Sequence, residues 1–190
     1  MKKAAGTLLL FVNLALRVPA AVPGLRFEAG ALYGPRFMAG ADIRSVYGRG
    51  SVYYPYAELN WRGLFIGAGY EGARPSRGNI GIYEEASSFQ LRGFDVFVGY
   101  GLKLRFVTPY VRIGCGTFAY RQTVDSQYVE NDKVDRRRAT ITLGIGARMY
   151  FFRHLFISGE GRYVPLEVSP FGQTVNLSGL RLLAGIGFSL

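Results

Sequence analysis

Apolar and polar side chains alternate strictly from Ile141 to Met149. The odd positions are apolar and the even positions carry a threonine, two glycines and Arg148. A period of two is typical of a β-strand whose two faces meet different surroundings. Glycine and arginine form an unusual face to offer water, so the pattern leaves open which face of the strand points outward.

The same alternation recurs along the chain and predicts eight β-strands. They are expected at residues 25–33, 53–61, 64–70, 89–102, 110–120, 139–151, 155–163 and 180–190. In the fourth segment the apolar residues change parity near Arg92 and Gly93, which predicts a β-bulge there.

The connections between these segments alternate in length. Short turns are expected around residues 62–63, 104–109 and 151–154, and long polar or mixed loops at 34–52, 71–88, 121–138 and 164–179. All long loops then lie at one end, and all short turns at the other. This arrangement predicts an all-β protein, an eight-stranded antiparallel up-and-down transmembrane β-barrel.

Charged residues of both signs recur on the faces opposite the apolar ones. We expect them to form a structural network of ion pairs in the lumen, because eight strands leave an interior just wide enough for side chains. The predicted members are Arg26, Glu28, Glu58, Arg62, Asp95, Arg112, Arg148, Glu160, Arg162 and Arg181. Glycines on the same face, such as Gly99 and Gly146, are expected to make room for the arginines. The apolar face would then contact lipid.

Aromatic residues gather near both ends of the predicted apolar band. The expected girdle residues are Tyr33, Tyr53, Tyr70 and Tyr163 at the long-loop rim, and Trp61, Tyr100 and Phe188 at the other rim. Two such belts are typical of a barrel that meets the two interfaces of a bilayer. A soluble ligand-binding barrel would turn its apolar face inward, and its loops would not alternate in this way.

The first residues have the pattern of an export signal. Lys2 and Lys3 precede an apolar run from Ala4 to Leu16, and Val18 to Ala20 offers small residues at the cleavage positions. This run is too short to span a bilayer, which takes about 20 residues. We therefore expect a secretory signal peptide at residues 1–20 and a single exported barrel domain at residues 21–190.

Composition narrows the chemistry. The chain has 190 residues and a net charge of +10, and arginine supplies most of the basic residues. Such a charge fits nucleic acid, acidic lipid headgroups or a GC-rich genome, and an exported barrel excludes the first. The single Cys115 and single His154 leave little for a metal site, and neither a metal nor a cofactor is expected.

Two motifs suggest enzymatic or nucleotide chemistry, but their context argues against both. The segment GAGYEG at residues 67–72 matches a dinucleotide fingerprint, yet Pro75 and Gly78 follow where a helix is needed. His154 with Ser158 or Glu160 suggests a lipid A-modifying hydrolase, but His154 falls in a short turn at the wrong end. We therefore expect no catalytic residues.

One run of charge lies at the long-loop rim. Arg136, Arg137 and Arg138 lie where the predicted sixth strand starts, beside Lys133 and two aspartates. A solvated loop base accounts for the run, and the alternative is contact with lipopolysaccharide phosphates, which arginine binds in a bidentate manner.

The segments TPYVRIGCG (108–116), LFISGEGRYV (155–164) and the closing LLAGIGFSL resemble the small outer-membrane β-barrel proteins of the OmpA-transmembrane-domain and opacity-protein type. The resemblance covers residues 25–190. It implies location in the cell outer membrane of a Gram-negative-type bacterium, among lipid and lipopolysaccharide. It also implies that the barrel-assembly machinery reads the last strand, although that strand ends on Leu190 rather than on an aromatic residue.

The resemblance implies a non-enzymatic envelope protein. Its surface loops would serve in adhesion, through a host or matrix ligand. Two alternatives remain open: a narrow porin-like channel for small solutes, and a lipid A-modifying enzyme.

Overall fold

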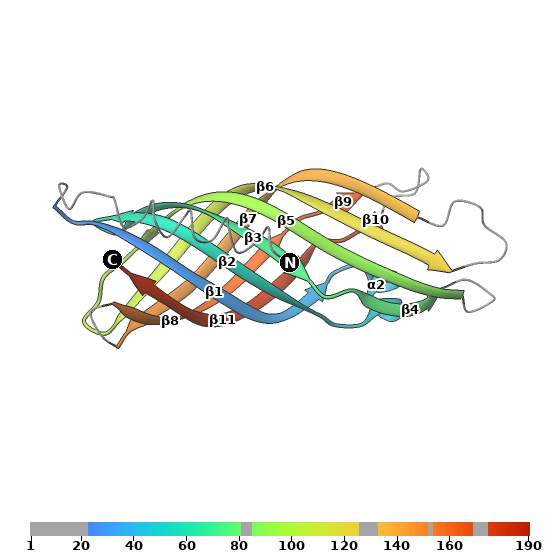
Figure 1. The fold of residues 1–190 in the computed structure, drawn as a ribbon, viewed down its shortest axis with the longest axis horizontal. Coiled ribbons are helices and arrows are strands. Elements are labelled where there is room, and N and C mark those ends of the chain that lie inside the picture. The colour runs from blue at the N-terminus through green and yellow to red at the C-terminus, as the bar shows by residue number, and fades with distance from the viewer. Residues whose placement is uncertain (1–22, 81–84, 126–132, 152–153, 169–174) are drawn as a thin grey trace, which may run out of the picture.

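The computed structural model describes residues 23–80, 85–125, 133–151, 154–168 and 175–190. Eight long antiparallel strands form a closed barrel (Figure 1). They are β1 (Leu25–Met38), β2 (Gly50–Trp61), β3 (Leu64–Ala73), β5 (Glu85–Gly101), β6 (Val107–Asp125), β7 (Lys133–Tyr150), β8 (Leu155–Val164) and β11 (Gly179–Ser189). The predicted fold class is confirmed, whereas the signal peptide expected at residues 1–20 lies outside the described residues.

Pairing of the first strand with the last closes the barrel. β1 runs antiparallel to β11, with Ala31 opposite Ile186. At the very end, the Phe27 N–H donates to the Leu190 carbonyl at 3.0 Å, and the Leu190 N–H donates to the Phe27 carbonyl at 2.8 Å. Closure matters because hydrocarbon offers no partner to the backbone groups of an open sheet edge.

Four short elements lie in segments that were expected to be loops. They are α2 (Ala41–Tyr47), β4 (Ser76–Ile80), which pairs with β5, and the small pair β9 (Glu167–Val168) and β10 (Val175–Asn176). No helix within the described ranges is long and apolar enough to cross a membrane.

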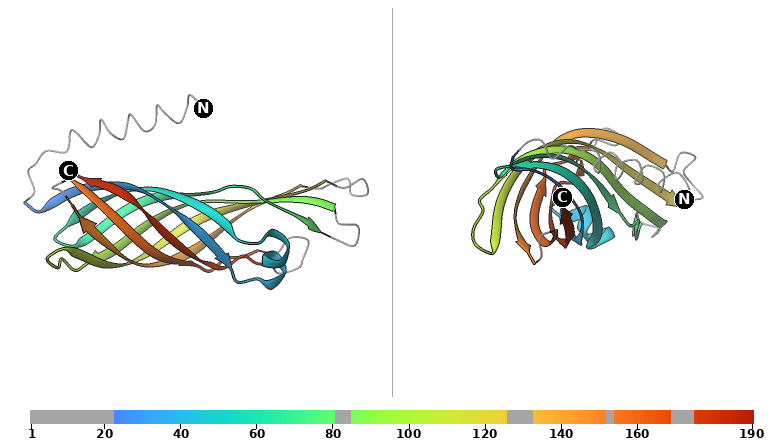
Figure 2. Two further views of the ribbon diagram at one scale, coloured as in Figure 1. Left: turned by 90° about the horizontal axis from the view of Figure 1, so that it is seen from below. Right: turned by 60° about the vertical axis from the view of Figure 1, so that its left-hand side comes forward.

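Strands β1, β5, β6 and β7 are longer than the sequence indicated. β5, β6 and β7 continue beyond the closed part of the barrel and project from it together with β4 (Figures 1 and 2). We call this projecting sheet the extension. It consists of β4 and residues 85–92 of β5, 119–125 of β6 and 133–137 of β7. Its strands stay paired where polar loops were expected.

The apolar faces of the strands point outward. The side chains of Ile145 and Ile186 are 66% and 71% exposed, and Ile66, Val111 and Leu143 are exposed as well. All seven predicted girdle residues, Tyr33, Tyr53, Trp61, Tyr70, Tyr100, Tyr163 and Phe188, are exposed on this outer surface. An outer surface made of Leu, Ile and Val is compatible with lipid and not with water.

The predicted bulge in the fourth strand is wrong. The register runs unbroken through it, with Arg92 opposite Ala119 and Gly93 opposite Phe118. Phe89 and Leu91 change the apolar parity because they take the inward-facing positions of β5. There they join a buried apolar cluster at the long-loop end, made of Met38, Tyr47, Phe89, Leu91, Phe118, Tyr120, Val164, Leu166 and Leu177. The interior is therefore apolar at this end and charged further down.

We predict that an arginine in place of Ile145 lowers the free energy of unfolding by about 2–4 kcal/mol, because this outward residue lies midway along the lipid-facing part of β7. Urea titration of the folded barrel in lipid vesicles measures the change. Ile145→Leu serves as the matched control and should leave the midpoint unchanged. Equal stability of Ile145→Arg and the parent would place this face in water.

Candidate functional site

An arginine on β7 holds two carboxylates together in the interior. The Arg148 guanidinium donates from Nη1 to Glu28 Oε2 at 2.7 Å and from Nη2 to Glu58 Oε2 at 2.9 Å, and Nη1 also contacts Glu58 Oε1. Glu28 and Glu58 are direct cross-strand neighbours on β1 and β2. The Tyr150 hydroxyl donates to Glu28 at 3.0 Å. These contacts tie β7 to the strands on the opposite side of the lumen.

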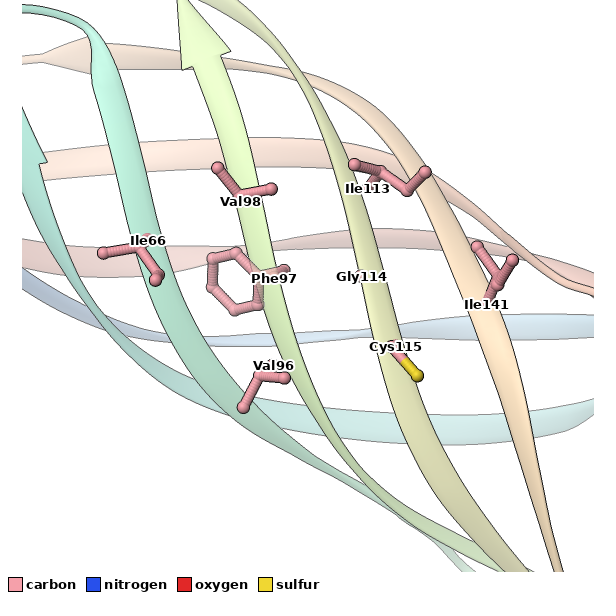
Figure 3. A pocket seen from close by; sticks show the side chains of 8 residues that line it. All are labelled: Ile66, Val96, Phe97, Val98, Ile113, Gly114, Cys115 and Ile141. Carbon is pink, nitrogen blue, oxygen red and sulfur yellow. The ribbon is translucent and has the colours of Figure 1, made fainter.

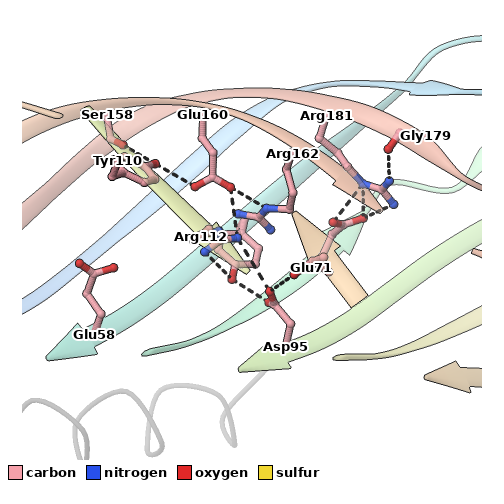
Figure 4. Close-up of polar contacts among 12 residues, drawn as sticks. Glu58, Glu71, Asp95, Tyr110, Arg112, Ser158, Glu160, Arg162, Gly179 and Arg181 are labelled. Carbon is pink, nitrogen blue, oxygen red and sulfur yellow. Dashed lines mark hydrogen bonds and ion pairs between the residues drawn. The ribbon is translucent and has the colours of Figure 1, made fainter. Parts of the chain in front are cut away.

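A second group of charges lies beside the first. Arg112 Nη2 is 3.1 Å from Glu160 Oε1 and 3.8 Å from Asp95 Oδ2, and Arg162 Nε donates to Glu160 Oε1 at 2.7 Å (Figure 4). Two tyrosines complete the carboxylate shells. Tyr54 donates to Asp95 at 2.7 Å, and Tyr110 donates to Glu160 at 2.9 Å. Both carboxylates are therefore satisfied by fixed donors.

The third group contains two charges that the sequence analysis missed. Glu71 on β3 accepts hydrogen bonds from Arg181 Nε at 3.2 Å and from Nη2 at 3.1 Å. Arg36 on β1 lies directly opposite Arg181 and is 0% exposed. The predicted strands stopped at Tyr33 and Tyr70, so neither residue was counted, although both have the inward parity of their strands.

Aromatic rings fill the interior between the charged groups, and this was not predicted. Arg148 lies 4.6 Å from the ring centroid of Tyr110 and 5.0 Å from that of Phe65, and Arg162 lies 3.5 Å from that of Tyr54. Such contacts between a cation and a ring face stabilise desolvated arginines. The sequence contained the information needed to predict this, because these rings have the same strand parity as the buried charges.

The interior glycines make room mainly for these rings rather than for arginines. A Cβ at Gly69 would lie 2.0 Å from the Tyr54 hydroxyl oxygen, and one at Gly146 would lie 2.6 Å from the Tyr110 ring. Gly144 is different, because the atom nearest to a Cβ built there belongs to an arginine, Arg112 Cγ at 2.9 Å.

The structure brings together eight of the ten predicted lumen charges, and Arg26 and Arg62 are not among them. Both are exposed at the short-turn end, and Arg62 lies in the tight turn before Gly63, over the Trp61 ring at 5.5 Å. Both residues have the inward parity of their strands, but they lie at the very end of the barrel, where no lumen encloses them. Their inclusion in the network is therefore corrected.

The three arginines of the predicted lipopolysaccharide contact do not share a face. Arg137 is exposed and has the outward parity of β7, whereas the neighbouring Arg138, also exposed, has the inward parity. The side chain of Arg136 lies outside the described residues. Consecutive residues of a strand point to opposite faces, so an unbroken run of arginine cannot act as one patch.

Two of the hollows on the outer surface differ in their chemistry. One, of ≈ 520 Å³, is lined by apolar side chains of the lipid-facing band around Cys115, including Ile66, Val96, Ile113 and Ile141 (Figure 3). The other, of ≈ 380 Å³, lies on the extension and is lined by Arg77, Gly78, Asn79, Ala86, Ser87, Ser88 and Thr123. The first offers only hydrocarbon contact, whereas the second offers hydroxyl, amide and guanidinium groups.

The described residues contain no obvious catalytic or metal-binding arrangement. His154 Nδ1 contacts the carbonyl of Ser189 at 2.9 Å, which ties the last short turn to the last strand. No group of three or more His, Cys, Asp or Glu side chains within the described ranges is placed to hold a metal ion.

We predict that Arg148→Met lowers the free energy of unfolding by about 3–5 kcal/mol, because it leaves Glu28 and Glu58 buried side by side without a cation. Denaturant titration in detergent micelles measures the change. Arg26→Met removes an exposed arginine at the barrel end and should change stability by less than about 0.5 kcal/mol. Similar losses in both variants would mean that the buried network adds nothing specific.

No family profile and no curated protein sequence matches the chain. Its structure is similar to Neisserial surface protein A (NspA), with 17% identity over 87% of this chain and 96% of the other and a TM-score of 0.53. It is also similar to Ail, the attachment invasion locus protein of Yersinia pestis, with 11% identity over 89% of this chain and 100% of the other and a TM-score of 0.54. A third similar structure is the outer membrane protein OprG of Pseudomonas aeruginosa, with 10% identity over 88% of this chain and 96% of the other and a TM-score of 0.57. At identities this low, the structural similarity shows the fold alone. Together with the apolar outer surface, that fold identifies the chain as an eight-stranded β-barrel of the outer-membrane type.

Proposed function

We propose that the chain is a non-enzymatic outer-membrane protein that attaches to an anionic polysaccharide through the extension, while its interior does not conduct solutes. The observation that carries this proposal is the extension itself. Three long strands and β4 continue past the lipid-facing band and present a polar, basic surface beyond it. The barrel below serves as an anchor.

The packed interior supports an anchor rather than a channel. Arg36 and Tyr54 are 0% exposed, and Phe65 and Arg162 are 1% exposed, although all four side chains face the lumen. The apolar cluster around Phe89 and Leu91 lies at the long-loop end of the same lumen. Water does not reach side chains buried to this extent, so the described interior leaves no aqueous path. The porin-like alternative has no support from this geometry.

The chemistry of the extension favours a sulfated or phosphorylated sugar as the ligand. Its outer-face hollow places the exposed guanidinium of Arg77 beside the hydroxyls of Ser88 and Thr123 and the amide of Asn79. Guanidinium groups bind sulfate and phosphate oxygens in a bidentate manner. Ail, which has the same fold, has been solved with the heparin analogue sucrose octasulfate. These features together support an attachment role.

Assembly and lipid partners follow from the same location. The last strand alternates apolar residues up to Leu190 and pairs with β1 over most of its length, which supports its recognition by the barrel-assembly machinery. A lipid A-modifying activity gains no support, because His154 lies in the short turn between β7 and β8 and contacts a backbone carbonyl.

We predict that the purified barrel binds immobilised heparin and that Arg77→Glu weakens this binding at least about tenfold, because repulsion replaces a charge-assisted contact. Surface plasmon resonance at fixed salt measures the affinity. Arg105→Glu makes the same charge change on an exposed arginine at the opposite end and is the matched control. Equal loss in both variants would indicate attraction by net charge alone, and absence of binding by the parent would refute the proposed ligand class.

We also predict that the parent barrel gives no unitary conductance steps in a planar bilayer, because its lumen is filled. A double variant, Phe65→Ala with Tyr110→Ala, removes two rings whose centroids lie 5.8 Å apart in the lumen and shows whether the assay detects an opened interior. Steady conductance steps from the parent would establish the channel alternative.

A further inference from the structure

One buried arginine near the long-loop end of the lumen has no counter-charge of its own. Arg36 is 0% exposed, and none of its three guanidinium nitrogens has a hydrogen-bond partner among the described residues. Its cross-strand partners are Gly50 on β2 and Arg181 on β11, so neither neighbour supplies a carboxylate. A buried guanidinium without an anion is costly, because the lost hydration of its charge is not replaced.

The buried charges around Arg36 carry a local positive excess. Arg36, Arg181 and Arg162 are consecutive cross-strand partners on β1, β11 and β8. The same row continues through Gly144 on β7 to Arg112 on β6. The carboxylates that contact these arginines are Glu71, Asp95 and Glu160 (Figure 4). Four buried cations thus share three carboxylates, and the cation without a carboxylate is Arg36.

The other two buried carboxylates do not supply the missing charge. Glu28 and Glu58 both contact Arg148, so that group has one carboxylate in excess. Eight residues of β1 separate Glu28 from Arg36, which corresponds to about 26 Å along the strand. The interior is therefore balanced as a whole but not locally, and no hydrogen bond spans that distance.

Small and polar residues line the space beside the Arg36 guanidinium. A Cβ built at Gly50 would lie 3.1 Å from Arg36 Nη2 and 3.5 Å from both Arg36 Nε and Ser76 Oγ, and no other atom would be nearer. Arg36 also lies over the ring of Phe89 at 5.6 Å, and Phe89 is the cross-strand partner of Ser76. Guanidinium and hydroxyl donors therefore converge on one point that no side chain of the protein fills.

We propose that this point marks a binding site for one small monovalent anion, chloride, held by the Arg36 guanidinium with the Ser76 hydroxyl as a second donor. One negative charge balances the excess, whereas a divalent phosphate or sulfate would reverse it. Arg36 and Gly50 are both buried, so the ion is a structural component of the lumen and not a solute in transit. The site is independent of the proposed attachment role, which concerns the outer surface around Arg77.

Anomalous diffraction locates such an ion directly. Crystals of the detergent-solubilised parent are grown in sodium bromide, because bromide replaces chloride and scatters anomalously. We expect an anomalous peak within hydrogen-bonding distance of the Arg36 guanidinium, and no peak there in Arg36→Met. Peaks confined to exposed arginines, or a water molecule without anomalous signal beside Arg36, would overturn the site.

The chloride dependence of stability measures the same site in solution. The barrel in detergent micelles is titrated with urea while chloride replaces gluconate at constant ionic strength, from the millimolar to the molar range. Above the Kd of the ion, each tenfold rise in chloride should lower the unfolding equilibrium constant of the parent about tenfold, because one ion binds only the folded state. Arg36→Met should lose this dependence.

Two further variants keep the test specific. Gly50→Ala retains the charge but places a methyl group beside Arg36 Nη2, and it should shift the dependence to higher chloride concentrations. Arg44→Met removes an exposed arginine at the same end and should behave as the parent. Heat-modifiable gel mobility verifies that each variant is folded. No chloride dependence in the parent, or the same dependence in the parent and Arg36→Met, contradicts the proposal.

Discussion

The structure depends on one constraint, which is that hydrocarbon offers no hydrogen-bond partner to a peptide group. Every strand in the lipid-facing part must therefore pair on both sides, and the pairing of β1 with β11 satisfies the two edges that an open sheet would leave. With eight strands the resulting lumen is narrow. The side chains that point inward must then satisfy one another, because few water molecules fit among them.

The interior meets much of this requirement by balance of charge, although the three guanidinium nitrogens of the buried Arg36 have no hydrogen-bond partner among the described residues. Five arginines and five carboxylates are buried within the described residues: Arg36, Arg112, Arg148, Arg162 and Arg181 with Glu28, Glu58, Glu71, Asp95 and Glu160. The aromatic rings between them supply π faces to the guanidinium groups and hydroxyl donors to the carboxylates. Removing one arginine therefore disturbs several partners from several strands.

Period-two alternation was enough to predict the barrel, its strand number and its outward face. It assigned Arg148, Glu58 and Glu160 to the interior because parity alone decides which way a strand residue points. The alternation of apolar and polar residues does not show where the closed part of the barrel ends. Arg26 and Arg62 continue the pattern past one end, and β5 to β7 continue it past the other, since pairing in the extension does not require lipid.

The apparent bulge had a related origin. If the interior is assumed to be polar throughout, the apolar Phe89 and Leu91 are assigned to the outer face, although both are buried inside. The girdle and most of the lumen charges could thus be assigned from local parity, whereas Glu71 and Arg36 required the actual strand lengths and register.

The lipid-facing band has a consequence for how such a protein changes over evolutionary time. That surface contacts a fluid with no shape of its own, so Ile145 or Ile186 can be exchanged for almost any aliphatic residue without loss of fit. In the lumen we expect only compensated exchanges to be accepted, because Arg148 is bound to two carboxylates at once. Loose constraints on one face and joint constraints on the other are compatible with a shared fold at identities of 10–17% to NspA, Ail and OprG.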